Sequence, residues 1–482
     1  MPTSAVSTRP HVVVVGGGIA GLAAALDVLD GLPTAEVTVL EGSDRLGGKL
    51  RVEPVAGHLV DVGAESLLAV RPEAVALAGR VGAAVDVVAP STTSAAVWSR
   101  GALRPLPRAT LMGVPTDPDS ARGVLADDEV ERLRDEREWP GGALDEDVPV
   151  GDYVATRLGQ AVVDRLVDPL LGGVYAGHAS RLSLRATVPT LWDRATRGQS
   201  LLAAPTNGAT TSDGGTPRPA FAGLVGGVGR LPGLVAEALR SRGVALRTLA
   251  PVRRLERVGE GWRLLVGSAA SPEVVAADAV LLCVPPTPAG RLLAAHAPTA
   301  ARVLGEVETA STAVVTLAVE RTGLGMLPGS GFLVPAVEGR TIKGSTFSGN
   351  KWAWTGDLSP DVVHLRASVG RAREEVVLQR SDEELVEVSV ADVEEALGRP
   401  LPRVVDAHVQ RWGGGLPQYA VGHVEAVASV RSQVARLPGL QVAGAAYDGV
   451  GVPAVIASAT RAAAATVHHL STISTRRGDR PG

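Results

Sequence analysis

The chain has 482 residues, of which 45% are hydrophobic and 20% charged, and its formal net charge at pH 7 is −4. This length suggests roughly three domain-sized units with sizeable cores. The absence of a basic arm or of interleaved aromatic and basic residues excludes an obvious nucleic-acid surface. The single cysteine, Cys283, excludes an intrachain disulfide framework and a cysteine-ligated metal cluster. Its apolar neighbours predict a packed thiol, and no metal site is expected.

The N-terminal sequence gives no targeting signal, because MPTSAVSTRP lacks the apolar core of a signal peptide. No uninterrupted apolar stretch reaches the ~18 residues that a membrane span requires. We therefore expect a cytoplasmic protein with at most peripheral membrane contact.

A strand, a glycine turn, a helix and a second strand follow one another over residues 11–41. The β-branched run Val12–Val15 is typical of a buried parallel strand, and Glu36–Leu40 predicts the second strand. The motif GxGxxG stands between them. Its glycines permit a tight turn, close approach of a pyrophosphate and close packing of helix on strand, while the helix N-terminus offers N–H groups to phosphates. The predicted phosphate-binding residues are Gly16, Gly17, Gly18, Ile19, Ala20 and Gly21.

Glu41 closes the second strand and can accept hydrogen bonds from both ribose hydroxyls, so this unit is predicted to bind an ADP moiety. A second glycine-rich loop, GSDRLGGKL, follows at once. An NAD-binding unit does not need it, whereas a long flavin brings its diphosphate and ribityl chain close to the backbone. The spacing E-x(3)-R-x-G-G resembles that of amine oxidase-like flavoproteins, so FAD is favoured over NAD, with an ordinary hairpin turn as the alternative. The loop adds the candidate cofactor-binding residues Gly42, Arg45, Gly47, Gly48 and Lys49.

The middle of the chain changes character. Residues 117–147 hold twelve acidic residues against four basic ones, and the run DDEVERLRDERE predicts a solvated helix. Residues 205–219 are polar and turn-forming, which predicts a mobile surface loop. Further helices are expected after the glycine turn in Phe221–Leu239, over Ser381–Leu397 and after the final turn DGVGVP. The predicted strands are Ala245–Leu249, Val252–Val258, Trp262–Val266, Ala279–Val284, Ala313–Glu320, Gly331–Pro335, Val362–Ser368 and Leu440–Ala445.

These elements predict an α/β fold (α+β overall), in which a Rossmann-like, two-dinucleotide-binding domain of the amine oxidase-like type carries FAD. That domain is expected to be discontinuous, over residues 1–95, 221–298 and 405–475. Residues 96–220 form the predicted helical insertion that lines the substrate cavity. Residues 299–404 form the predicted substrate-binding domain with an antiparallel, mixed sheet.

Six separated segments carry motifs, and together with the first glycine turn they span about residues 15–455. They are VDVGAESLLAVRPEAVAL at 60–77, GGVYAG at 172–177, FAGLVGGVGRLPGLVAEAL at 221–239, TFSGNKWAW at 346–354, RWGGGLPQY at 411–419 and DGVGVP at 448–453. These segments resemble the protoporphyrinogen/coproporphyrinogen oxidase family, the flavoenzymes that aromatise a porphyrinogen late in haem synthesis. GGVYAG and RWGGGLPQY are the most specific of them, because other amine oxidase-like enzymes lack both.

The resemblance implies an oxygen-dependent coproporphyrinogen III oxidase of haem b biosynthesis. Such an enzyme removes six electrons to give coproporphyrin III, while three O2 become three H2O2. The GAES and GGVYAG forms favour the Gram-positive-type branch, with protoporphyrinogen IX oxidation as the alternative. Flavin N5 is the implied hydride acceptor, so no catalytic side chain is expected. More distant alternatives are an amine oxidase or carotenoid desaturase and a non-catalytic flavoprotein, although 3% aromatic residues suit an amine-binding cage poorly.

The resemblance also extends the set of candidate cofactor-binding residues. The loop after the GAES motif, an adenine contact, a tryptophan beside the flavin and the last flavin loop are implied. These residues are Gly63, Ala64, Glu65, Ser66, Val252, Trp412, Val450, Gly451 and Val452.

Three residues are implied to bind the substrate. Arg71 would bind a carboxylate, or else be an exposed arginine at a helix start. Lys351 would do the same or pair locally, and Tyr175 would pack on the macrocycle or fill a core. The acidic residues 117–147 are expected to face away from the entrance, because they would repel a carboxylated substrate. The implied partners are the porphyrinogen, O2 and, transiently, the next haem-pathway enzyme of ferrochelatase type, and the oligomeric state stays open.

Overall fold

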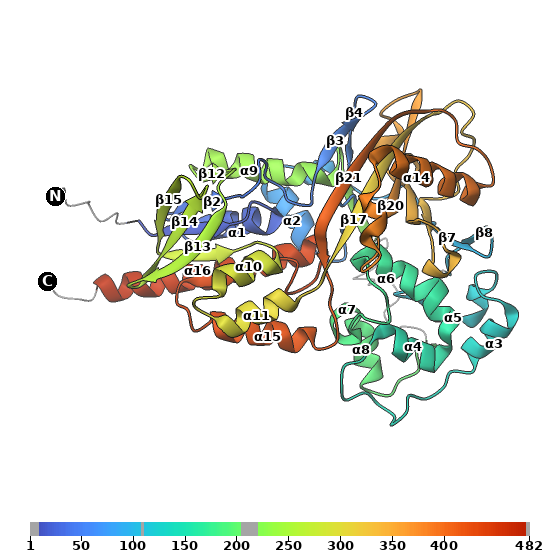
Figure 1. The fold of residues 1–482 in the computed structure, drawn as a ribbon, viewed down its shortest axis with the longest axis horizontal. Helices are drawn as coiled ribbons and strands as arrows, with labels where there is room; N and C mark the ends of the chain where they lie inside the picture. Colours follow the sequence, from blue (N-terminus) through green and yellow to red (C-terminus); the bar gives the residue numbers. More distant parts are fainter. Residues whose placement is uncertain (1–8, 108–109, 204–219, 479–482) are drawn as a thin grey trace.

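The computed structural model describes residues 9–107, 110–203 and 220–478, so the loop predicted over residues 205–219 lies outside the described residues. The molecule is elongated, with both chain ends beside one sheet, and a second large sheet and a group of helices at the other end (Figure 1). None of the helices in the described ranges is both long and apolar enough to cross a membrane.

A five-stranded sheet forms the half of the molecule near the chain ends, and all of its neighbouring strands are parallel. In spatial order its strands are β12 (Ala245–Arg247), β2 (Glu36–Leu40), β1 (His11–Val15), β16 (Ala279–Leu282) and β22 (Leu440–Val442). Side chains of β1 alternate between two buried cores, one of which contains α1 (Ile19–Gly31) and α16 (Val452–Gly478). Burial on both faces explains the continuous apolar run of β1. The five predicted strands are confirmed, and three of them end earlier than predicted.

A smaller antiparallel sheet contributes to the second of these cores. It contains β13 (Val252–Val258), β14 (Gly261–Gly267) and β15 (Pro272–Ala277). The sequence predicted the first two strands and missed β15. That strand is mostly exposed and lacks an alternating apolar pattern, which is the usual sequence signal of a strand.

A seven-stranded sheet dominates the other half. Its spatial order is β21 (Val404–Pro417), β17 (Thr309–Glu320), β20 (Val362–Val369), β19 (Ile342–Phe347), β18 (Gly331–Leu333), β7 (Ala96–Ser99) and β8 (Ala102–Pro105). All pairs are antiparallel except β18 with β7. Helix α14 (Asp382–Leu397) packs on one face and begins with a reciprocal cap between Ser381 and Glu384. The strands predicted at 313–320, 331–335 and 362–368 and the helix at 381–397 are confirmed.

This sheet does not follow the predicted domain boundaries. β7 and β8 come from the segment predicted as helical insertion, and β21 comes from the segment assigned to the flavin domain. The reason is that β21 pairs with β17 along nearly its whole length, and β7 pairs with β18. The sheet therefore extends past residues 96 and 405, while the division into three domains stays a prediction.

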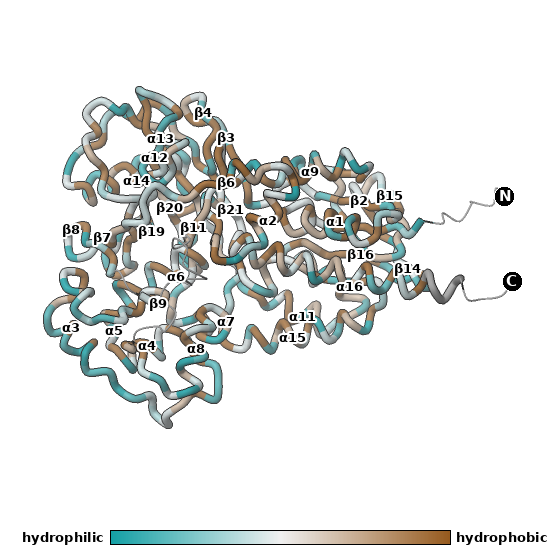
Figure 2. The backbone as a smooth tube through the Cα atoms, turned by 180° about the vertical axis from the view of Figure 1, so that it is seen from behind, coloured by the Kyte–Doolittle hydropathy of each residue, from teal (hydrophilic) through white to brown (hydrophobic). Residues whose placement is uncertain are grey.

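The insertion is a group of helices with a core of its own. It includes α3 (Asp127–Arg134), α4 (Val150–Leu158), α6 (Asp168–Tyr175) and α8 (Pro189–Ala195). The predicted acidic helix is α3, which lies at the outer end of the group (Figure 1) and is mostly hydrophilic (Figure 2), while its Val130 and Leu133 are buried in the core of the insertion. Its charges are paired locally, since Arg122 lies 2.9 Å from Asp119 and 2.6 Å from Asp127.

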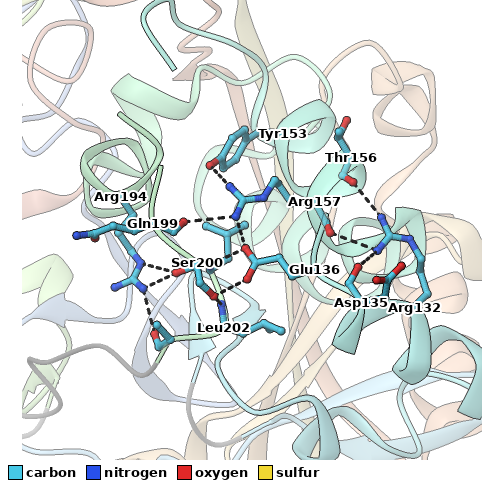
Figure 3. Close-up of polar contacts among 12 residues, drawn as sticks. Arg132, Asp135, Glu136, Tyr153, Thr156, Arg157, Arg194, Gln199, Ser200 and Leu202 are labelled. Atoms are coloured by element: carbon cyan, nitrogen blue, oxygen red, sulfur yellow. Dashed lines mark hydrogen bonds and ion pairs between the residues drawn. The ribbon is translucent and has the colours of Figure 1, made fainter. Parts of the chain in front are cut away.

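One buried ion pair fastens the insertion together (Figure 3). Arg157 of α4 is 6% exposed, donates to the Tyr153 hydroxyl at 2.7 Å and pairs with Glu136. Glu136 also accepts hydrogen bonds from the Leu201 amide at 2.7 Å and from the Ser200 hydroxyl. The pair therefore ties residues 200–201 to α4 and to the chain that follows α3.

Breaking this pair should destabilise the protein. Arg157→Met leaves the Glu136 carboxylate buried without its cation, which is expected to lower the free energy of unfolding by about 3–5 kcal/mol. Chemical denaturation measures the change. Arg134→Met, which removes an exposed pair on α3, is the matched control and should change stability little because solvent screens it. Equal losses in the two variants would contradict the role given to Arg157.

Candidate active site

The turn between β1 and α1 places its glycines against backbone. Gly16 has φ +108°, and a Cβ there would lie 2.5 Å from the carbonyl oxygen of Cys283. A Cβ on Gly21 would lie 1.9 Å from the carbonyl oxygen of Gly16. Gly18 differs, because the nearest atom to its Cβ position is Cα of Gly48 at 3.9 Å. No side chain caps α1, so the turn offers open space and free amide groups to an anion.

Glu41 and the second glycine loop lie beside this turn. Glu41 Oε2 accepts a hydrogen bond from the Gly17 amide at 2.7 Å, and Oε1 accepts two from Ser43 at 2.8 Å. The Gly47 amide donates to the Gly17 carbonyl at 2.9 Å, and Gly47 also forms a β-bridge with Gly18. The structure thus brings together the predicted ribose acid and both predicted phosphate-binding loops.

Trp412 of β21 lies where the second loop meets the predicted flavin loop. The guanidinium of Arg45 lies 5.9 Å from the centre of the Trp412 ring, and burial lowers the Arg45 pKa. Trp412 Nε1 donates to the Val62 carbonyl at 3.1 Å. A Cβ on Gly63 would lie 2.2 Å from the Lys49 carbonyl oxygen and 3.3 Å from the Trp412 ring. This close approach explains why position 63 holds a glycine, while the Lys49 side chain stays exposed.

The predicted adenine contact lies next to the ribose acid. Val252 is the first residue of β13, and the nearby Ala250 amide donates to the Glu41 carbonyl at 2.8 Å. A Cβ on Gly42 would lie 3.7 Å from Pro251. Ile19 and Ala20, by contrast, are buried in the core, so they could meet a cofactor only through their backbone.

Glu65 anchors the predicted flavin loop, residues 63–66, to the seven-stranded sheet. Its carboxylate is buried and lies 3.0 Å from Lys351 Nζ and 2.6 Å from Arg366 Nη1, and it accepts a hydrogen bond from the Ser348 hydroxyl at 2.9 Å. Burial alone would raise the pKa of Glu65, but the two cations hold it well below its usual range. Arg366 also donates to the Gly63 carbonyl. Ala64 stays exposed, so one side of the loop is open while the other is fixed.

Arg366 and Asp61 belong to this region although neither was predicted as a site residue, even though Asp61 lies within the 60–77 motif. Arg366 lies within a strand that the sequence predicted, and the only available signal was a charged residue inside a β-branched run. Asp61 accepts hydrogen bonds from the Val228 and Gly229 amides at 2.9 and 2.7 Å, just before α9 (Leu231–Ser241). Burial raises the pKa of Asp61 to about 7. The sequence did not reveal the role of Asp61, because Val228, one of its hydrogen-bond donors, is 167 residues away.

The last predicted loop, Val450–Val452, lies between two cores. Val450 packs against the insertion and Val452 against the core of α1 and α16. The Tyr419 hydroxyl accepts a hydrogen bond from the Gly449 amide at 2.7 Å and donates to the Ala445 carbonyl at 2.6 Å. The RWGGGLPQY segment is therefore in direct contact with the DGVGVP turn.

The two most specific motifs also contact each other. Gln418 of the RWGGGLPQY segment donates from Nε2 to the Tyr175 carbonyl at 2.7 Å. A Cβ on Gly177, the last residue of GGVYAG, would lie 2.1 Å from Gln418 Oε1. The Tyr175 ring is 5.6 Å from that of Tyr419. Together these segments form the joint between α6 of the insertion and β21 of the sheet.

Arg71 is the predicted substrate residue with the most open surroundings. It lies just before α2 (Glu73–Arg80), its side chain is 42% exposed, and its ion-pair partner is Glu73 at 2.8 Å. Leu68 and Phe221 pair across β5 (Leu67–Leu68) and β11 (Phe221–Leu224), and both are exposed. A guanidinium next to exposed apolar surface suits a flat molecule that carries carboxylates.

The other two predicted substrate residues have internal partners. Tyr175 is 6% exposed within the core of the insertion, where burial raises its pKa to about 12. Lys351 is bound to Glu65 and donates from Nζ to the Ser66 hydroxyl at 2.7 Å. Lys351 thus pairs locally and Tyr175 packs in a core, and contact of either residue with a substrate stays a prediction.

The residues of this region fit an FAD. Open space at Gly18, uncapped amides of α1 and the two oxygens of Glu41 match a diphosphate and a ribose. The backbone at residues 47–49 and at residue 63 packs so closely against neighbouring backbone that several positions require glycine. In the described ranges, no group of three or more His, Cys, Asp or Glu residues is placed to hold a metal ion.

Removing the charge of Glu65 should loosen the flavin loop. In Glu65→Gln the cations of Lys351 and Arg366 lose their buried anion, so a lower Tm and at least about tenfold weaker FAD binding are expected. The flavin-to-protein absorbance ratio and a thermal melt measure both effects. Glu308→Gln, which breaks an exposed pair with Arg373, is the control and should retain FAD. Full FAD content together with an unchanged Tm in Glu65→Gln would rule out the anchoring role.

Comparisons with known proteins extend over the whole site. A family model described as flavin containing amine oxidoreductase matches residues 19–467. A protein of Mycobacterium tuberculosis named coproporphyrinogen III oxidase is 37% identical over 95% of this chain and 97% of its own length. The protein of the same name from Bacillus subtilis is 27% identical over 92% of this chain and 95% of its own length.

Solved structures agree with the fold. The crystal structure of a candidate protoporphyrinogen oxidase from Exiguobacterium has a TM-score of 0.82 and 31% identity, and the match covers 98% of this chain and all of that one. Cyclohexylamine oxidase from Brevibacterium oxydans, at TM-score 0.68 and 17% identity, shares the fold over 96% of this chain and 100% of its own. The predicted flavin-binding fold and the FAD cofactor are thus confirmed. The chain belongs to the flavin-containing amine oxidoreductases, in the protoporphyrinogen/coproporphyrinogen oxidase family that its motifs resemble.

Proposed function

We propose that this chain is an FAD-dependent oxidase that removes six electrons from coproporphyrinogen III and forms coproporphyrin III, while three O2 are reduced to three H2O2. One observation carries this proposal. The similarity to proteins named coproporphyrinogen III oxidase runs over 95% of the chain, so it includes both glycine loops, the insertion and the seven-stranded sheet.

The residues that would hold FAD are those that the fold gathers around the end of β1. The α1 amides and Glu41 would bind the diphosphate and ribose, and residues 63–66 would meet the flavin ring. FAD, when bound, supplies the acceptor for hydride from the porphyrinogen and passes the electrons to O2. Glu65 stays ionised beside Lys351 and Arg366, so its role is to fix the loop rather than to donate a proton.

Arg71 would bind a carboxylate of the substrate through two parallel hydrogen bonds. The exposed side chains of Leu68 and Phe221 would cover part of the apolar macrocycle. Tyr175 and the joint around Gln418 would form the wall contributed by the insertion. Helix α3 lies at the outer end of the insertion (Figure 1), and its acids would there be kept away from a carboxylated substrate.

Protoporphyrinogen IX is the second candidate substrate. A protein of Macaca fascicularis named protoporphyrinogen oxidase is 30% identical over 94% of this chain and 97% of its own length. We further propose the division into three domains, a cytoplasmic location with at most peripheral membrane contact, and transient transfer of the product to the next haem-pathway enzyme, of ferrochelatase type. No role with nucleic acid is proposed.

Anaerobic mixing tests the reaction itself. Coproporphyrinogen III added to the FAD-loaded protein should bleach the flavin absorbance at about 450 nm, because electrons accumulate on the cofactor without O2. Putrescine, a substrate of the amine oxidase type, should leave it unchanged. Bleaching by the amine and by neither porphyrinogen would reject the proposed function.

Replacing Arg71 tests the substrate contact. Arg71→Ala should raise KM for coproporphyrinogen III by about tenfold or more through loss of a charge-assisted bond, while FAD content stays intact. Arg80→Ala at the other end of α2 is the matched control, because Arg80 pairs with Asp27 and Asp30 and should leave KM unchanged. Loss of FAD from Arg71→Ala would mean that this arginine is structural instead.

A further inference from the structure

Two buried cations, Lys343 and Arg371, lie together at one end of the seven-stranded sheet. Lys343 is 6% exposed and Arg371 is 7% exposed. Lys343 occupies an irregularity of β19, between the two residues that pair with Val369 and Ser368 of β20. Arg371 lies two residues beyond the last residue of β20, Val369.

One backbone residue connects the two cations. Arg371 Nη2 donates to the Val334 carbonyl at 2.9 Å, and the Val334 amide donates to the Lys343 carbonyl at 2.8 Å. The charges are close enough that Arg371 adds to the effect of burial, and together they lower the pKa of Lys343 to about 7. Two basic side chains are thus held near each other inside the protein.

No acid neutralises them within the part of the chain that the structure describes. Lys343 has neither an ion pair nor a side-chain hydrogen bond there, and the Val334 carbonyl is the only hydrogen-bond acceptor of the Arg371 side chain. Burial lowers the pKa of Arg371. The negative charges of Glu374 and Asp168 act in the opposite direction, but neither acid forms an ion pair with Arg371. Those two acids lie instead 3.2 Å and 3.9 Å from His178.

Three other buried or nearly buried arginines of the described chain show the opposite arrangement, since each forms an ion pair with a carboxylate. The pairs are Arg157 with Glu136, Arg165 with Glu338, and Arg366 with Glu65. Burying a charge without a partner is costly, and proteins usually pair or neutralise it. Lys343 and Arg371 therefore lack an anion that the fold supplies elsewhere.

The two cations lie next to the insertion. The amide of Ala372, next to Arg371, donates to the Ala176 carbonyl at 2.7 Å, at the end of α6. Leu333 of β18 lies 3.8 Å from the Cβ position of Gly173 in the same helix. The cations thus lie at the junction of sheet and α6, where the GGVYAG motif of the proposed substrate wall begins.

We propose that Lys343 and Arg371 form a second carboxylate-binding site, which takes a propionate of the tetracarboxylate substrate that Arg71 does not bind. This inference rests on the proposed function. Arg371 would contribute a bidentate fork and Lys343 a point charge. A tetracarboxylate needs more cationic partners than a dicarboxylate, so this site would favour coproporphyrinogen III over protoporphyrinogen IX.

Lys343→Met in the FAD-loaded enzyme is the central test. It should raise KM for coproporphyrinogen III by about tenfold, whereas KM for protoporphyrinogen IX should change less than about twofold. Arg371→Lys, which keeps the charge and loses the fork, should have an intermediate effect. Equal changes for both substrates, or none for either, would overturn the proposal.

Stability gives a second readout that a structural role would not reproduce. Without substrate, Lys343→Met removes an unpaired buried cation and should raise Tm by about 2–4 °C. Arg373→Met, two residues from Arg371, removes an exposed cation paired with Glu308 and is the matched control for both readouts. A lower Tm in Lys343→Met would show that the fold itself satisfies this cation, and the proposal would fail.

Product binding separates this inference from the proposed function. Coproporphyrin III and its tetramethyl ester are titrated into the wild-type and Lys343→Met proteins, with fluorescence quenching as the signal. Weaker binding of the acid alone in the variant supports the carboxylate site, even if the wild type oxidises neither porphyrinogen and the proposed function fails. Equal binding of the acid by both proteins overturns the site, even if the wild type is an active oxidase.

Discussion

The buried carboxylate of Glu65 is the constraint on which the geometry of the site depends. It collects Lys351 and Arg366 from two separate parts of the seven-stranded half and fixes them to a loop of the flavin half. Because two cations surround one anion, the cluster keeps a positive charge after pairing. That charge is next to the loop expected to meet the flavin ring, and it would favour an electron-rich, reduced cofactor.

The same principle organises the joint between the insertion and the sheet. Gln418 and Tyr419, which directly follow β21, satisfy backbone groups at α6 and at the DGVGVP turn. The two motifs expected to be the most specific for this family therefore meet at one point. Their specificity is explained by mutual contact, because a change in either segment would leave buried polar groups unpaired.

The cofactor half was predictable from the sequence because its signals are local. Gly21, whose Cβ would lie 1.9 Å from the carbonyl oxygen of Gly16 five residues earlier, belongs to a motif that a short window of sequence reveals. Arg366 and Lys343 gave no such signal, since the partner of Arg366 is 301 positions away and Lys343 is marked by burial alone. Asp61 lies within a motif, but its partner Val228 is 167 positions away, so its role was not predicted. β19 and β21 were missed for a related reason. Glycines and polar residues interrupt their alternation where the sheet meets the site.

Pairing also sets what the substrate has to supply. Arg157, Arg165 and Arg366 each pair with a carboxylate of the protein, so their guanidinium groups stabilise the fold and are not available to a ligand. Where the fold provides no carboxylate, as for Lys343 and Arg371, the cost of an unpaired charge persists until an anion arrives. Binding energy is then available only to a ligand that carries a carboxylate at that position. A dicarboxylate that binds only Arg71 would leave Lys343 and Arg371 without an anion. Discrimination between porphyrinogens would then come from the cost of these unpaired cations as much as from their attraction to a carboxylate.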